Sequence, residues 1–130
     1  MHSKRVFKTK TFDRWARKLL SDRVLCAAAL DIENGRFEAD LGGGVCKKRI
    51  AMPGQGKSGA TRTLVAKQHP DAIIFLVGRE KNAPGTDFPD ALVAAVKIVA
   101  DNFHRQSLAK LVSLMSSGEL KEICDEQEGQ

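Results

Sequence analysis

The sequence predicts an α+β fold, in which a small antiparallel sheet has helices packed on one face and leaves the other face partly open. Apolar residues at helical spacing lie near both ends of the chain, and runs of β-branched and aliphatic residues fill its middle. The expected order of elements is β-α-α-β-β-β-α-α. Because 130 residues is the usual size of one domain, we expect a single domain over residues 1–130, with about 124–130 as a frayed tail.

The N-terminal part is expected to contain a strand and two helices. Residues 6–10 begin with two apolar side chains and are short, as a first strand would be. Thr11 is a candidate helix cap, because apolar residues follow it at helical spacing up to Leu19. Ser21-Asp22 signals the start of a second helix, and Asn34-Gly35 is typical of a helix end.

Three strands are expected in the middle of the chain, over residues 45–51, 62–67 and 72–77. The third, "AIIFLV", is apolar on both faces, as a central strand is. The short connections between these strands favour an antiparallel meander. Helices are expected after it, from about Asp90 and from Ser107, and a short extended segment is expected in "ELKEI".

Positive charge is concentrated in the middle of the chain. The formal net charge of the whole sequence is +5, whereas residues 42–81 alone carry eight basic and two acidic side chains. Residues 82–130 carry four basic and eight acidic side chains. A basic zone of this kind favours a polyanionic partner such as nucleic acid, with a solvated basic face as the alternative.

The sequence gives no signal for a metal, a cofactor or a membrane span. Three cysteines and three histidines are scattered, without the close spacing that metal ligands need. Cys26, Cys46 and Cys124 are therefore expected to be buried or surface thiols in a reducing compartment. No apolar run approaches the roughly 20 residues that span a bilayer, and no secretory signal is visible. We therefore expect a cytoplasmic protein without cofactors.

The stretch "KKRIAMPGQGKSGATRT", residues 47–63, contains a loose match to a nucleotide-binding phosphate loop in "AMPGQGKS". Such a loop needs a helix N-terminus directly after it, because the helix amides complete the anion site. Here "GATRTLVAK" follows, and its glycine, threonine and valine residues disfavour a helix. We therefore interpret the match as accidental and expect a β-hairpin with Lys57 at the tip of its loop.

The predicted sheet collects cations on one face. Side chains alternate along a strand, so Lys47 and Arg49 share a face. Arg62 begins the next strand, and the third strand ends near Arg79 and Lys81. Like charges this close repel one another unless an anion binds between them. The pattern therefore indicates a phosphate-binding surface. The alternative is that these cations extend into solvent or pair with Asp40 and Glu80.

Several stretches together resemble the RelE/HigB-like toxins of type II toxin-antitoxin systems, in the RelE/ParE superfamily. They are "RVFKTKTFDRWARK", "DLGGGVCKKRIAMPGQGKSGATRTLVA", Lys81-Asn82 and "SLAKLVSLMSSGELKEI". The best match is to the branch with a "GGG-x-x-KKRIA-x-PGQGK-x-G" signature, and the resemblance covers nearly the whole chain. It implies a RelE-like fold and a ribosome-dependent mRNA endonuclease (an mRNA interferase) that inhibits translation. It also implies an antitoxin, often one with a helix-turn-helix domain.

The resemblance further implies metal-independent cleavage of RNA, in which the 2′-oxygen attacks the adjacent phosphate. A base removes the proton, and cations stabilise the extra charge on the phosphate. Family toxins use lysines and arginines of the central strands for this work. The corresponding candidates are Lys47 or Lys48 as the base and Arg62 as the residue that holds the scissile phosphate. Further candidates for binding RNA phosphates are Arg49, Lys57, Arg79 and Lys81.

The sequence leaves a second function open. The chain has no tyrosine, although some relatives stack an aromatic hydroxyl side chain on a base, and Arg79-Glu80 stands where Phe-Ala is common. The alternative is a non-catalytic RNA- or protein-binding module on the same fold that has lost cleavage. For the toxin, we expect an antitoxin encoded next to the chain and contact with operator DNA only through that antitoxin.

Overall fold

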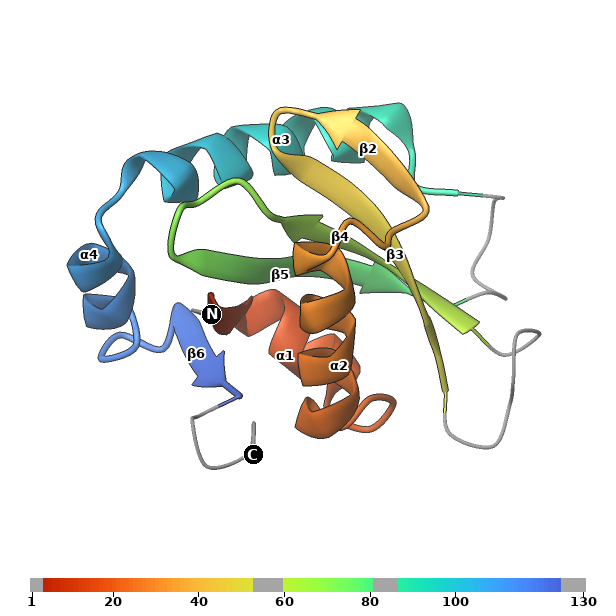
Figure 1. The fold of residues 1–130 in the computed structure, drawn as a ribbon, viewed down its shortest axis with the longest axis horizontal. Coiled ribbons are helices and arrows are strands. Elements are labelled where there is room, and N and C mark those ends of the chain that lie inside the picture. Colours follow the sequence, from red (N-terminus) through yellow and green to blue (C-terminus); the bar gives the residue numbers. More distant parts are fainter. Residues whose placement is uncertain (1–3, 53–59, 81–86, 125–130) are drawn as a thin grey trace.

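The computed structural model describes residues 4–52, 60–80 and 87–124. Four helices lie around one open six-stranded sheet in this part of the chain (Figure 1). In chain order the elements are β1 (Arg5–Thr9), α1 (Lys10–Ala16), α2 (Asp22–Glu33), β2 (Ala39–Gly42), β3 (Val45–Ala51), β4 (Ala60–Ala66), β5 (Ala72–Arg79), α3 (Asp90–Arg105), α4 (Leu108–Ser113) and β6 (Leu120–Ile123). The predicted α+β class is confirmed. Within the described ranges, no helix is both long and apolar enough to cross a bilayer.

The sheet has the strand order β2-β3-β4-β5-β1-β6. The strands from β2 to β5 follow one another as antiparallel neighbours, as the predicted meander requires. β1 departs from the antiparallel expectation, because it pairs in parallel with β5, with Phe7 opposite Ile74. β6 pairs antiparallel with β1 and confirms the extended segment expected in "ELKEI". β2 is a strand that the predicted order does not contain.

Helices cover both faces of the sheet, whereas the sequence predicted helices on one face (Figure 1). On one face, Phe12 of α1 and Leu25 of α2 share a core with Phe75 of β5. On the other face, Val96 of α3 and Leu111 of α4 belong to a second core. The physical reason lies in β5, whose successive apolar side chains point to opposite faces, so that both faces need cover.

Hydroxyl side chains set the starts of three helices. Ser21 and Ser107 each accept a hydrogen bond from the backbone N–H three residues further on, as the sequence predicts for α2 and α4. The first helix differs, because Thr9 caps it in place of Thr11, with a bond of 3.1 Å from the N–H of Phe12. β1 therefore runs directly into α1.

The cysteines differ from the expectation of three thiols. Cys26 of α2 and Cys124, directly after β6, form a disulfide between positions 98 residues apart in the sequence. Cys46 of β3 is a buried thiol, in agreement with the prediction. Sequence spacing gave no reason to pair Cys26 with Cys124, because only the fold brings the end of β6 beside α2.

Candidate nucleic-acid interface

The central strands bring basic side chains into register. Arg49 of β3 lies opposite Arg62 of β4, and Arg62 lies opposite Arg79 of β5. Lys47 comes two residues before Arg49 and therefore projects from the same face of the sheet. The structure thus brings together Lys47, Arg49, Arg62 and Arg79, which the sequence singled out, and we call these residues the basic cluster.

The basic cluster lies on the face that α3 and α4 cover, at the end of the sheet where the chain enters α3. Along β3 and β4, Val45 and Leu64 project from the same face as the basic cluster, and both belong to the core under α3. Phe88 precedes α3, and its ring centroid lies 5.8 Å from the guanidinium carbon of Arg79. The cations are therefore mounted on regular strands, directly beside a packed core.

A cavity of about 160 Å³ opens beside the basic cluster. Lys47, Arg49 and Arg62 line it, together with the carboxylates of Glu38 and Asp87. Three cations against two carboxylates leave the cavity with a net positive charge. Guanidinium and ammonium groups bind phosphate oxygens through charge-assisted hydrogen bonds, so the cavity is chemically suited to a phosphate group.

Asp87 links two members of the basic cluster. Its carboxylate pairs with the ammonium group of Lys47, and its backbone carbonyl accepts a hydrogen bond from Arg79. The other carboxylate oxygen accepts a bond of 2.8 Å from the N–H of Phe88. The hydrogen bond from Lys47 holds the pKa of Asp87 below its ordinary value, although burial opposes this. Asp87 is therefore negative at neutral pH and competes with any phosphate for Lys47.

Residues 4–123 match the family model described as the RelE toxin of the RelE / RelB toxin-antitoxin system. The chain belongs to the RelE toxin family. It is therefore the toxin component of a toxin-antitoxin system, and an antitoxin is its partner. No match to a curated protein was found.

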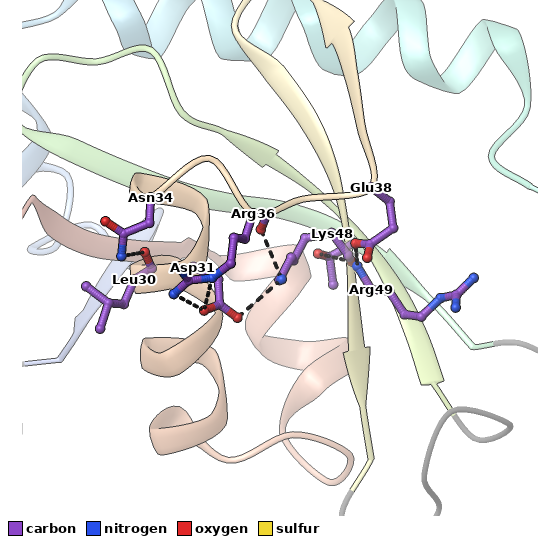
Figure 2. A network of polar contacts seen from close by, with 8 residues as sticks. Leu30, Asp31, Asn34, Arg36, Glu38, Lys48 and Arg49 are labelled. Atoms are coloured by element: carbon purple, nitrogen blue, oxygen red, sulfur yellow. Dashed lines mark hydrogen bonds and ion pairs between the residues drawn. The ribbon is translucent and has the colours of Figure 1, made fainter.

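In this RelE-family toxin, Lys48 lies apart from the basic cluster. It is buried on the opposite face of the sheet, where its ammonium group lies 3.3 Å from the Asp31 carboxylate of α2 (Figure 2). The same group donates to the backbone carbonyl of Arg36 at 3.1 Å. The structure thus ties Lys48 to α2 and does not bring it beside Arg62.

Two carboxylates that the sequence did not single out line the candidate site. Glu38 accepts a hydrogen bond of 2.5 Å from the backbone N–H of Arg49, whose side chain extends away from the Asp31 network in Figure 2. Glu38 directly precedes β2, a strand that the sequence did not predict. The signal for Asp87 was weak, since it lies in "TDFPD", a turn-like stretch before a helix.

Lys57 and Lys81, two predicted phosphate contacts, lie outside the described residues and stay predictions. Over residues 4–52, 60–80 and 87–124, no group of three or more His, Cys, Asp or Glu side chains is placed to hold a metal ion. The cavity beside the basic cluster is lined by cations and carboxylates. Such groups can bind a phosphate and accept or donate protons.

Proposed function

We propose that this RelE-family toxin is a ribosome-dependent mRNA endonuclease that inhibits translation in the cytoplasm. The observation that carries the proposal is the basic cluster, which presents cations from three neighbouring strands on one face, beside a net positive cavity. Like charges at opposed positions of a sheet are destabilising. A bound anion relieves this repulsion, and the RNA backbone is a polyanion.

In the proposed reaction, the 2′-oxygen of the RNA attacks the adjacent phosphorus, and the bond from that phosphorus to the 5′-oxygen of the next nucleotide breaks. The leaving 5′-oxygen takes a proton from water and departs as a hydroxyl group. Arg62 holds the scissile phosphate and, with Arg49, stabilises the negative charge that grows on its oxygens. Lys47 takes the proton of the 2′-hydroxyl, since it lines the same cavity, whereas Lys48 faces α2. Lys47 first separates from Asp87 and gives up its ammonium proton to water, so that its neutral amine can accept the 2′-proton.

The proposal includes further phosphate contacts. Arg79, Lys57 and Lys81 bind phosphates that flank the scissile one, as cations do along an RNA backbone. We also propose that the antitoxin is a helix-turn-helix protein encoded next to the chain. The toxin would then reach operator DNA only through the antitoxin. Membership of the RelE family supports the existence of this partner.

One observation favours a second candidate function, a non-catalytic RNA- or protein-binding module. Asp87 already pairs with Lys47, the residue proposed as the base. If this pair persists when RNA binds, the basic cluster holds phosphates but has no group ready to take the 2′-proton. The two candidates therefore differ in the fate of the RNA, not in its binding.

Induced expression in a bacterial host tests the proposal, with growth, protein synthesis and the 5′ ends of mRNAs followed together. The endonuclease should arrest growth and cut mRNAs inside translated regions, while untranslated RNAs stay intact. Co-expression of the adjacent gene should relieve the arrest. Arrest with intact mRNA would favour the binding module. Normal growth in the presence of full-length, folded protein would contradict the endonuclease.

A further inference from the structure

A second cavity, of about 260 Å³, adjoins the one beside the basic cluster. Lys47 and Asp87 line both cavities, so their ion pair lies at the boundary between the two. The remaining lining of the second cavity comes from β2, from Phe88 and from the first two turns of α3. A ligand that occupies both cavities therefore contacts the Lys47–Asp87 pair on its way from one to the other.

The second cavity has an apolar wall. Phe88 is buried in the core under α3, with 7% of its surface exposed. Leu41 of β2 and Val93 of α3 are half-buried and pack against the same core. A flat, apolar ring could pack against these side chains and exclude water from them.

The charged groups of the second cavity balance one another. Lys47 and Lys97 line it together with Asp87 and Asp90. The first cavity differs, because its three cations outnumber its two carboxylates. A balanced set of donors and acceptors does not select an anion. It suits an uncharged group that itself presents both hydrogen-bond donors and acceptors.

Lys97 is placed by the glycine turn between β2 and β3. Gly42 and Gly43 have φ angles of 84° and 63°, which glycine adopts without strain. A Cβ atom on Gly43 would lie 3.4 Å from Cγ of Lys97, and one on Gly42 would lie 3.6 Å from its Nζ. Because these glycines have no side chains, the backbone of the turn lies close against the Lys97 side chain. Asp90, Val93 and Lys97 follow at spacings of three and four residues, so they share one face of α3.

We propose that the second cavity binds one nucleobase of the RNA whose phosphate lies in the first cavity. A base has apolar ring faces and an edge with both donors and acceptors, which matches the wall and the charged groups of this cavity. Its phosphate is joined to it through a single ribose, which matches two cavities that share a boundary. The volume is below the roughly 300–1,000 Å³ of pockets for drug-sized ligands, as one ring system requires.

This inference rests on the proposed function, because it needs a phosphate in the first cavity. It goes further by naming what holds a base in a chain without tyrosine. The pocket holds the ring by burial against Leu41, Phe88 and Val93, and Lys97 and Asp90 contact its edge.

Titration of the purified protein with ribose 5-phosphate and with the four ribonucleoside 5′-monophosphates, followed by NMR at low salt, tests the pocket. At least one nucleotide should bind about tenfold more tightly than ribose 5-phosphate, which corresponds to about 1.4 kcal/mol. Equal affinities for all five ligands would overturn the nucleobase pocket and leave the phosphate site standing. No binding of any of them would contradict the phosphate site, and the pocket would fall with it.

Two variants locate the effect. Val93→Phe fills the cavity and Lys97→Met removes its charged edge, so each should reduce nucleotide affinity to the level of ribose 5-phosphate. Lys110→Met removes one exposed charge of α4 and is the matched control, with no change expected. If Val93→Phe fails to fold, Lys97→Met carries the test. Unchanged nucleotide binding in Lys97→Met would overturn the proposal. It would also be overturned if folded Val93→Phe bound nucleotides normally and lost only its affinity for the antitoxin.

Discussion

Arg49 and Arg62 lie directly opposite each other on the antiparallel strands β3 and β4. Two like charges in this position are destabilising for a sheet, and Arg79 continues the row on β5. Arg49 and Arg62 line a cavity with a net positive charge, where a bound anion would relieve the repulsion. We interpret the row as a feature kept for binding an anion at some expense in stability.

Arg62→Gln is expected to lower the single-turnover rate of mRNA cleavage roughly 10- to 100-fold. The variant loses one charge-assisted contact to the phosphate, worth about 1.5–3 kcal/mol. Its free energy of unfolding should change by no more than about 0.5 kcal/mol, because the change relieves repulsion with Arg49. Arg105→Gln, at an exposed position of α3, is the control and should cleave normally. A wild-type rate for folded Arg62→Gln would remove Arg62 from the site.

Neighbouring lysines of β3 should give opposite results. Lys47→Met should abolish cleavage and leave the free energy of unfolding nearly unchanged, because the Lys47–Asp87 pair is partly exposed. Lys48→Met should lower the free energy of unfolding by about 1–3 kcal/mol, because Lys48 is buried against Asp31. Its cleavage rate per folded molecule should stay near wild type. Thermal unfolding and single-turnover cleavage, measured on both variants, check this. Lost cleavage in folded Lys48→Met would move the base to the α2 face.

Asp87→Asn is expected to bind RNA more tightly than the wild type, because Lys47 no longer pairs with a carboxylate. One added phosphate contact should steepen the dependence of log affinity on log salt by about 0.7. Since the pKa of Asp87 is lowered, protonation should produce the same gain in the wild type only at a pH below the ordinary range of an aspartate. Asp101→Asn on α3 is the control. Weaker RNA binding by Asp87→Asn would contradict the competition between Asp87 and phosphate for Lys47.

The strand alternation within "KKR" was predictable from the sequence, and so was the hairpin that carries it. Lys47 and Arg49 share a face, and Arg62 follows on the next strand, because local periodicity alone decides these relations. The parallel pairing of β1 with β5 was not predictable in this way, since it joins residues 67 positions apart. The second helical layer depends on the same long-range arrangement.

The candidate site was predictable in its cations and not in its carboxylates. Asp87 lies beside Lys47 only because the residues directly before α3 pack against the sheet, where Phe88 belongs to the core. The Glu38 carboxylate accepts a hydrogen bond from the backbone N–H of Arg49, and no pattern in the sequence predicts such a contact. Strand alternation put Lys47 and Lys48 on opposite faces, but the sequence left both as candidates for the base. The partner of Lys48 required the position of α2.

Cysteine chemistry gives a separate prediction. In the folded protein without reductant, no cysteine should react with iodoacetamide at pH 8. Cys26 and Cys124 are joined, and burial raises the pKa of Cys46 to about 12, so its reactive thiolate is scarce. After gentle reduction, mass spectrometry should show alkylation at Cys26 and Cys124, and at Cys46 only after unfolding. Reaction of Cys26 and Cys124 before reduction would mean that they are thiols, as the sequence predicted.

The attack of the 2′-oxygen on a phosphate held by the basic cluster is best tested with two mRNAs on programmed ribosomes. One is all-ribose, and the other carries a single 2′-deoxynucleotide at the position of cleavage. We predict that the toxin cuts the first to leave a 2′,3′-cyclic phosphate, binds both equally, and leaves the second intact in a single-turnover assay. Cleavage of the 2′-deoxy mRNA at the same position and rate would contradict the proposed chemistry.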